Sequence, residues 1–339
     1  MKWDLVFRGS VTDIAATARR AEEAGWDGIR LPETAHDVFV AAALAAPATT
    51  SLEIGTSVAI AFARNPMTIA SCAHDLHRVT EGRFELGLGS QIRPHITKRY
   101  SMPWSSPAAR MRELILAVRA IWENWESGEK LNVRGSFYTH TLMTPTFSPG
   151  PLGFPPPRIT LAAVGPRMIK VAAEVADGII CHPLSTPRYI ESTVLPALEQ
   201  RRGSNGPERI ELSGQILVAT GADDESLGAS IEEVRSRIAF YASTPAYRPV
   251  LEAHGLGHLQ DDLNALSKQG RWDDMARRID DDVLELFAVV AAPDSVRTEI
   301  ERRVGYLFDR VALTPSGPTP DFLHRVVGRT AIDTAAVPT

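Results

Sequence analysis

A strand–helix–strand unit at residues 53–91 constrains the fold of this chain more than any other stretch. Its first part, residues 53–62, is apolar and rich in small or β-branched residues, which is typical of a strand buried on both faces. Asn65 and Pro66 then supply an N-cap and a proline for the first helical turn, and apolar residues follow at helical spacing. A short strand at 84–89 completes the unit, so the pattern predicts two parallel strands joined by a right-handed crossover.

The same alternation of short apolar strands and amphipathic helices continues along the whole chain. Strands are expected at about 3–7, 27–31, 53–62, 84–89, 158–163, 177–181, 210–219, 287–290 and 310–313, with helices after nearly all of them. One of these helices is expected at 187–202, and the tail after Pro318 is expected to be partly helical. Such alternation forms either an open doubly wound sheet or a closed (β/α)8 barrel. Because no linker divides the 339 residues, we expect one (β/α)8 TIM-barrel domain spanning residues 1–339.

Two segments interrupt the alternation, one after the fourth strand and one after the seventh. Residues 131–158 are dense in proline, glycine and aromatic residues, and they are too long for a plain connector. Residues 223–286 read as mostly helical and are too long for a single crossover. We therefore expect two ordered insertions, the first of them running over one end of the fold.

Composition excludes several classes of function. The net charge of −5 argues against a general nucleic-acid binder, whose surface would be basic. No run of 18 apolar residues and no signal-type leader is present, so we expect no membrane association. Two cysteines, Cys72 and Cys181, suit a reducing compartment better than a disulfide framework. The expected location is the cytoplasm.

In a barrel of this kind the active site lies at the carboxyl ends of the strands. That position selects six candidate segments, at 8–9, 33–37, 58–64, 90–95, 163–167 and 181–182. Gly87 and Gly89 resemble half of a dinucleotide fingerprint, but in a barrel they are simply a tight strand end. His74 and His77 have metal-ligand spacing without an evident third ligand, so we place them on the outer face of a barrel helix and expect no metal site.

The sharpest local pattern is Ala163-Val164-Gly165-Pro166-Arg167-Met168. Gly165 at a strand end permits the close approach of an anion, and Pro166 begins a helix. The amides of Arg167 and Met168 are expected to point outward at the positive end of the helix dipole, where Arg167 adds a cation. The pattern suits the phosphate of a nucleotide-like cofactor, and a helix that merely begins with Gly-Pro accounts for it equally well.

Taken together, residues 55–70, 82–90 and 159–180 resemble the bacterial luciferase-like superfamily. They are most similar to its branch of oxidoreductases that use the deazaflavin coenzyme F420, and the similarity covers about residues 1–220 and returns at 287–313. The resemblance implies a (β/α)8 barrel with the tricyclic cofactor ring at the mouth formed by the strands' carboxyl ends. It also implies that both insertions roof this pocket. The candidate wall residues are Trp104, Phe137, Tyr138 and Phe154, and packing within the insertions accounts for them equally well.

The resemblance also implies a set of site residues. A bulge in the third strand should hold a non-prolyl cis peptide near Ser57-Val58, or at Val58-Ala59, behind the ring. Residues expected to bind the cofactor are Glu33, Ser57, Val58, Ala59, Ser90, Gln91, Ala163, Val164, Gly165, Pro166, Arg167 and Met168.

Two histidines are the candidate catalytic residues, His36 by the resemblance and His95 by its place in a loop where this chain departs from the family. His36 falls near a histidine that relatives carry after the second strand, and it either moves protons there or is a solvated loop residue. In sugar-phosphate dehydrogenases of this branch a catalytic glutamate follows the fourth strand, and Ile92 stands at that position here. Sugar-phosphate oxidation by that mechanism is therefore not expected, and His95, in the same loop, becomes the candidate proton donor.

The expected function is an F420-dependent oxidoreductase that transfers a hydride between the deazaflavin and a small organic substrate. One alternative is an FMN-dependent luciferase-like monooxygenase on the same barrel, and another is a non-catalytic protein that binds a deazaflavin or flavin. The family also implies a homodimer, for which the alanine-rich helices around 38–48 and 66–80 are suited to close packing.

Overall fold

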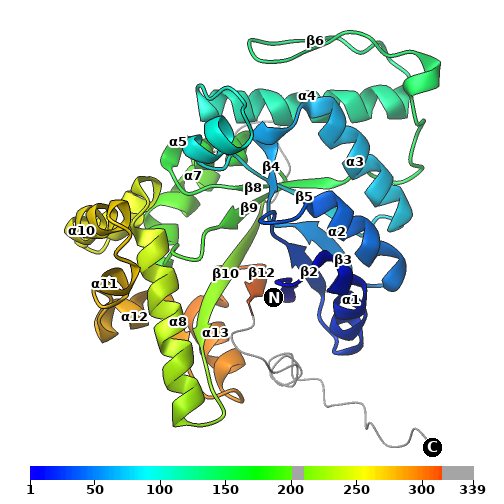
Figure 1. Ribbon diagram of the computed structural model, residues 1–339. Helices are drawn as coiled ribbons and strands as arrows, with labels where there is room; N and C mark the ends of the chain where they lie inside the picture. The colour runs from blue at the N-terminus through cyan, green and yellow to red at the C-terminus, as the bar shows by residue number, and fades with distance from the viewer. Residues whose placement is uncertain (201–209, 315–339) are drawn as a thin grey trace, which may run out of the picture.

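In the computed structural model of the chain, which describes residues 1–200 and 210–314, eight parallel strands close into a barrel (Figure 1). In order around the barrel they are β1 (Lys2–Val6), β2 (Gly28–Leu31), β3 (Glu53–Thr56), β5 (Phe84–Gly89), β8 (Arg158–Ala162), β9 (Gly178–Cys181), β10 (Glu211–Ala219) and β12 (Arg310–Leu313). The ring closes where β12 pairs with β1, in the register Lys2 to Arg310. The predicted (β/α)8 barrel is confirmed.

Helices surround the strands, as the alternation predicts (Figure 1). They are α1 (Ile14–Glu23), α2 (Val38–Ala45), α3 (Pro66–Val79), α4 (Pro107–Ser127), α5 (Pro166–Val175), α6 (Pro187–Tyr189), α7 (Leu195–Glu199) and α13 (Val296–Val304). Asn65 caps α3 by accepting the amide of Thr68 at 3.1 Å, as its position before Pro66 predicts. The helix expected at 187–202 is divided, because a π-helical turn at Ile190–Val194 separates α6 from α7. Its last residues and the tail after Pro318 lie outside the described residues.

The third strand is shorter than its apolar run. β3 ends at Thr56, the Ser57–Val58 peptide is cis, and a two-residue strand, β4 (Ala59–Ile60), then pairs with the end of β5. A turn of 3-10 helix at Ala61–Ala63 follows where extended chain was expected. Small side chains here allow the chain to turn inside the packed barrel, where Ala59 and Ala61 are buried.

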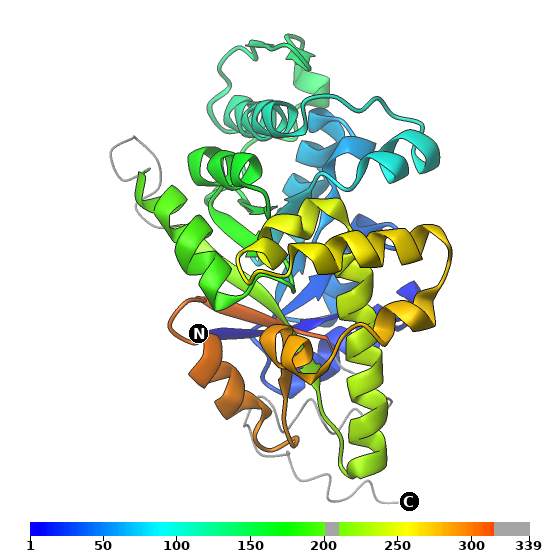
Figure 2. The same ribbon diagram turned by 90° about the vertical axis from the view of Figure 1, so that its left-hand side faces the viewer.

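The second insertion is helical. It contains α8 (Asp224–Ala242), α9 (Arg248–Glu252), α10 (Gly257–Lys268), α11 (Trp272–Ala276) and α12 (Asp281–Phe287), which form a lobe beside the barrel (Figures 1 and 2). The lobe has its own apolar cluster, which reaches the barrel at Leu217 and Ala219 of β10. A short strand, β11 (Ala288–Val290), leaves the lobe and pairs with the last three residues of β10.

The first insertion lies against α4. Its hairpin, β6 (Val133–Arg134) and β7 (Thr139–His140), lies on the outside of α4 (Figure 1). There the Glu113 carboxylate of α4 accepts the amides of Ser136, Phe137 and Tyr138. The insertion follows the end of a helix, not the end of a strand, and therefore begins at the amino end of the barrel. The chain then returns along α4 to its first two turns, where Tyr138 accepts a hydrogen bond from Arg110, and the roofing of the mouth by residues 131–158 stays a prediction.

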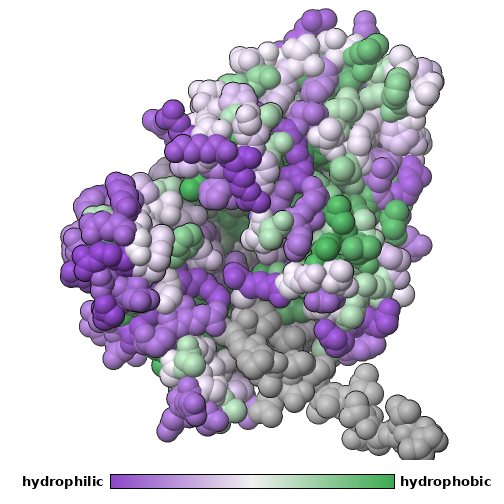
Figure 3. All heavy atoms as spheres, viewed as in Figure 1, coloured by the Kyte–Doolittle hydropathy of each residue, from purple (hydrophilic) through white to green (hydrophobic). Residues whose placement is uncertain are grey.

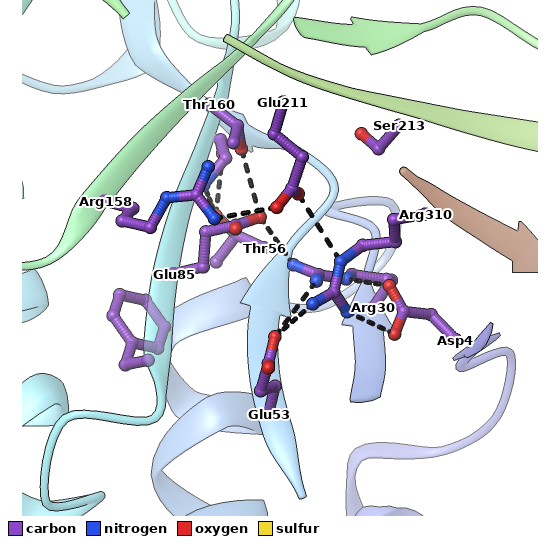
Figure 4. A network of polar contacts seen from close by, with 12 residues as sticks. Asp4, Arg30, Glu53, Thr56, Glu85, Arg158, Thr160, Glu211, Ser213 and Arg310 are labelled. Atoms are coloured by element: carbon purple, nitrogen blue, oxygen red, sulfur yellow. Dashed lines mark hydrogen bonds and ion pairs between the residues drawn. The ribbon is translucent and has the colours of Figure 1, made fainter. Parts of the chain in front are cut away.

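A network of ion pairs fills the amino end of the barrel, among residues near the starts of the strands (Figure 4). Asp4 is fully buried and accepts from Arg30 Nε at 2.6 Å and from Arg310 Nη1 at 2.5 Å. Arg30 also donates to Glu85 at 2.6 Å. Burial favours a raised pKa for Asp4, but Arg30 and Arg310 outweigh it and hold the pKa below its ordinary value. The network therefore links the barrel strands to one another at the end opposite the mouth.

Candidate active site at the barrel mouth

The cis peptide lies at the mouth, directly after β3, at the first of the two positions that the resemblance implied. Two glycines of β5 let that strand approach it. A Cβ on Gly87 would lie 1.9 Å from the carbonyl oxygen of Thr56, and one on Gly89 would lie 2.4 Å from Cγ2 of Val58. These distances leave no room for a side chain at Gly87 or Gly89, which explains the Gly-x-Gly pattern as a tight strand end packed against residues 57–59.

Glu33, at the end of β2, supports the same bulge. Its carboxylate is nearly buried and accepts the amide of Ile60 at 2.7 Å and both terminal nitrogens of Arg64, at 2.8 and 2.7 Å. Arg64 also binds Asp37, which caps α2. Both oxygens of Glu33 are thus engaged in positioning β4, and its direct contact with a cofactor stays a prediction.

Residues 163–168 connect β8 to the start of α5, as expected. Ala163 is buried, Val164, Gly165 and Met168 are partly exposed, and Pro166 and Arg167 are exposed. A hollow of about 610 Å³ lies between this segment and the start of α4, lined by Ser106, Pro107, Ala108, Ala109, Gly165, Pro166, Arg167 and Met168. A Cβ on Gly165 would meet nothing within 4 Å, so the hollow begins at its backbone.

One detail of this segment corrects the sequence analysis. The amide of Met168 does not point outward, because it donates to the carbonyl of Gly165 at 2.9 Å. Of the two amides expected to face an anion, only that of Arg167 remains for this role. Its side chain adds a positive charge at the same helix end.

The two predicted catalytic histidines stand on neighbouring loops. His36 is exposed and lines a hollow of about 370 Å³ beside Arg8, at the ends of β1 and β2. His95 is exposed on a short π-helix, His95–Arg99. Arg99 of that π-helix donates to the carbonyl of Thr34 at 2.7 Å, which brings the loop of His95 against the loop of His36.

Ser90 and Gln91 continue from β5 at the same end of the barrel. Both are partly exposed, and the Ser90 hydroxyl donates to the carbonyl of Gln91 at 3.2 Å. Gln91 adopts a left-handed conformation with φ of 58°, and its side-chain oxygen accepts the amide of Ile92 at 2.9 Å. The strand therefore ends abruptly here and presents polar groups where the resemblance places cofactor contacts.

The aromatic residues expected as pocket walls are distributed differently. Trp104 packs edge-on against buried Phe62, next to the cis bulge, with ring centroids 5.7 Å apart. Tyr138 accepts a hydrogen bond from Arg110 on the outside of α4, where Phe137 is also held. Phe154 packs against His77 of α3. Of the four, Trp104 packs next to the bulge and Tyr138 is linked to the same Phe62 through Arg110, whereas Phe137 and Phe154 contact other parts of the barrel's helices.

Two histidines of α3 also differ from their expected setting. His74 and His77 are buried, not on an open outer face, because residues of the outer insertion cover them. The two ring nitrogens of His77 lie 2.9 Å from the carbonyl oxygen of Phe84 and 3.0 Å from that of Pro155.

Cys181 of β9 is buried as well, and burial raises the pKa of its thiol to about 12.

His182 belongs to the segment 181–182, which its position at a strand end selected as a candidate without assigning it a role. The register between β8 and β9 ends with Ala162 opposite Ile180, two residues before Val164 and His182. The ring of His182 stacks on Tyr247 at 4.0 Å and meets Tyr241 edge-on at 4.8 Å. Both tyrosines come from the helical insertion. In the sequence, the position of His182 at a strand end was the only signal that it could belong to the site.

Residues 5–310 match the family model described as luciferase-like monooxygenase. The chain belongs to this family. An uncharacterized protein of Mycobacterium tuberculosis (strain ATCC 25618 / H37Rv) is 48% identical over 309 residues, which cover 89% of this chain and 91% of that protein. A 5,10-methylenetetrahydromethanopterin reductase of Methanolobus tindarius is 25% identical and covers 95% of this chain and 96% of its own length.

Solved structures with the same fold extend this result. The coenzyme F420-dependent tetrahydromethanopterin reductase of Methanopyrus kandleri has a TM-score of 0.78 at 21% identity, covering 97% of both chains. An F420-dependent secondary alcohol dehydrogenase, solved with an F420–acetone adduct, has a TM-score of 0.73 at 17% identity, covering 96% of both chains. An FMN complex of a type II Baeyer–Villiger monooxygenase from Pseudomonas putida has a TM-score of 0.66 at 14% identity, covering 96% of this chain and 97% of that one. Within residues 1–200 and 210–314 of this family member, no helix has both the length and the apolar character that crossing a bilayer requires.

Proposed function

We propose that this family member is a coenzyme F420-dependent oxidoreductase that transfers a hydride between the deazaflavin and a small organic substrate. The observation that carries the proposal is the pairing, at one end of the barrel, of the bulge at Ser57–Val58 with the open helix start at Gly165. The bulge offers a small-residue support for a flat ring. The helix start offers a place for a phosphate.

The chain's own residues fit such a cofactor. The hollow of about 610 Å³ at the start of α5 is large enough for a charged cofactor tail, and it begins at a glycine whose Cβ position is open. Arg167 and the positive end of the helix dipole favour an anion at this point. Behind the bulge, Glu33 accepts the amide of Ile60 in β4 and Arg64 donates to the Ile60 carbonyl, while two further hydrogen bonds join Arg64 to Glu33, so the support for the ring is held rigidly.

When bound, the deazaflavin would supply the carbon that gives or accepts the hydride. The protein would contribute orientation and a proton route. His36 is exposed in a hollow next to the mouth, and an imidazole is able to give or take a proton in the physiological pH range. His95 lies on the neighbouring loop, which the Arg99–Thr34 contact joins to the loop of His36, and it would serve as a second proton carrier.

The printed functions of similar proteins support this choice of cofactor. The Methanolobus reductase aligns along almost the whole chain, and two proteins of the same fold are described as F420-dependent. The FMN complex on the same barrel supports a second candidate, an FMN-dependent monooxygenase. The two candidates differ in the ring that the bulge supports, and a binding experiment separates them.

The test is a fluorescence titration of the purified protein with F420 and, separately, with FMN. We expect F420 to bind at least about tenfold more tightly, which corresponds to 1.4 kcal/mol. A preference for FMN would favour the monooxygenase, and oxygen uptake would then be measured. Binding of neither would overturn both candidates. The same titration of the Gly165→Trp variant is the matched control, because the added side chain would fill the hollow without touching the barrel core.

A further inference from the structure

His182 directly follows β9 at the mouth of the barrel. β8 and β9 pair so that Ala162 lies opposite Ile180, and Val164 and His182 each follow two residues later. Ile180 points into the barrel, since a Cβ on Gly87 of β5 would lie 3.0 Å from its Cδ1. Residues two apart along a strand share a face, so an alternation continued one residue beyond Cys181 would direct His182 to the same interior side at the mouth.

Two tyrosines of the lobe fix the plane of this ring. Tyr247 stacks on it at 4.0 Å with an interplanar angle of 25°, and Tyr241 meets it edge-on at 4.8 Å and 81°. Tyr241 belongs to α8, and Tyr247 follows it in a 3-10 turn. Figure 3 shows the surface hollowed between this lobe and the helices on the opposite side of the view. The ring thus stands at the inner wall of the lobe.

A backbone hydrogen bond decides which nitrogen of His182 carries the proton. The amide of Leu184 donates to Nδ1 at 3.2 Å, so Nδ1 is the acceptor and Nε2 bears the hydrogen. Burial lowers the pKa of His182 to about 3, which keeps the ring neutral at physiological pH. His182 is therefore a fixed N–H donor and not an acid.

We propose that His182 donates its Nε2–H to the oxygen on the reacting carbon of the substrate, which makes the substrate a ketone or, in the reverse direction, a secondary alcohol. This inference rests on the proposed function. In the reducing direction the hydride of the reduced deazaflavin forms a C–H bond at the carbonyl carbon, and the π pair moves to the oxygen. A proton delivered by His36, the carrier in the proposed function, completes the alcohol, while His182 keeps its own proton and stabilises the negative charge through the hydrogen bond.

The same geometry separates this substrate class from the one in the names of the methanopterin reductases. A reacting carbon bound to nitrogen offers no oxygen for a fixed N–H donor. A donor left without its acceptor in a partly buried site costs binding energy. His182 therefore favours carbonyl chemistry over reduction at a carbon–nitrogen centre.

The first arm of the test needs no turnover. Nitrogen-15 NMR of histidine-labelled protein should show His182 as the neutral Nε2–H form from pH 5 to pH 8, and acetone added to the F420-loaded protein should shift that resonance. A ring that titrates near the ordinary histidine pKa, or that carries its proton on Nδ1, would overturn the assignment. An unchanged resonance on addition of acetone would do the same.

The second arm uses reduced F420 with acetone and cyclohexanone as probes. His182→Phe keeps the stacked ring but removes the donor, so kcat/KM should fall by about 100-fold, whereas the affinity for F420 should stay unchanged. His182→Gln restores a donor near the Nε2 position and should recover at least about tenfold of that loss. His258→Phe, at an exposed histidine of α10, is the matched control and should equal the wild type.

The outcomes separate this inference from the proposed function. If the wild-type protein does not bind F420, the proposed function is refuted. The NMR experiment would still show which nitrogen of His182 carries the proton. A protein that binds F420 but reduces neither ketone would overturn the substrate class. Equal kcat/KM for wild type and His182→Phe would overturn the role of His182.

Discussion

Gly89 and Val58 approach so closely that a Cβ atom on Gly89 would lie 2.4 Å from Cγ2 of Val58. Gly89→Ala should therefore displace the bulge after β3 and lower the free energy of unfolding by about 1–3 kcal/mol, since extra volume in a packed core is costly. Urea denaturation measures this effect. Gly165→Ala is the control and should unfold like the wild type, because its Cβ would enter open space. Equal stability of the two variants would contradict the predicted packing.

Arg310 and Asp4 form a buried pair at the other end of the barrel. Arg310→Leu should cost about 3–5 kcal/mol of stability, because it removes one of the two cations that bind the buried Asp4 carboxylate. Adding Asp4→Asn should recover part of that loss. The check is a double-mutant cycle by chemical denaturation, and strictly additive costs would show that the pair is not coupled.

Arg167 carries the charge of the predicted phosphate site. Arg167→Ala should weaken F420 binding by about tenfold at low salt, and the difference from wild type should shrink as salt is added. Thermal unfolding should be unaffected, because the side chain is exposed. Lys170→Ala, an exposed cation one turn further along α5, should change the affinity little. Similar losses in both variants would indicate a general charge effect.

His36 is predicted to move protons. His36→Ala should lower kcat by at least about tenfold while changing the dissociation constant of F420 less than threefold, since general acid–base groups contribute about 10²–10⁴ to rate. Stopped-flow measurement of cofactor oxidation separates the two effects. If His36→Ala leaves kcat unchanged, His36 is a solvated loop residue without a role in proton transfer.

Stability should fall on the acid side of neutrality. Burial lowers the pKa of His74, and that of His182 to about 3, so the folded protein binds fewer protons than the unfolded chain between that pH and about 6.5. The free energy of unfolding therefore rises with pH across this window. The melting temperature should be lower at pH 5.5 than at pH 7.5, and His74→Phe should reduce the difference. A melting temperature that rises on acidification would refute this sign.

The local patterns allowed the prediction of much of the fold. The strand–helix–strand unit at 53–91 appears with β5 at the predicted residues, and the cis peptide occupies Ser57–Val58, one of the two positions that the motif match left open. These features are encoded over short distances, by capping residues, glycines and apolar runs. The resemblance contributed the position of the bulge, which the residues alone did not indicate.

Features that depend on register were not predictable. Asp4, Arg30, Glu85 and Arg310 stand in apolar strands far apart in sequence, and only the barrel register brings them together. The Tyr247–His182 stack likewise joins β9 to an insertion whose path the pattern leaves open. The path of the insertion at 131–158 along the outside of α4 was not predicted, because its composition does not indicate on which side of that helix it runs. The homodimer stays a prediction, although apolar side chains, among them Val40 and Leu44, are exposed on α2 (Figure 3).

β10 is long enough to belong to two structures at once. Its first six residues complete the barrel with β9 and β12, and its last three, Leu217 to Ala219, pair with β11. The two ends of the lobe are therefore joined by a strand ladder, which attaches the lobe to the barrel. The loops at 32–37 and 90–106, which carry the predicted catalytic histidines, lie outside the strands. A lineage that came to accept bulkier substrates would be expected to change the lengths of those two loops and to leave the attachment of the lobe untouched.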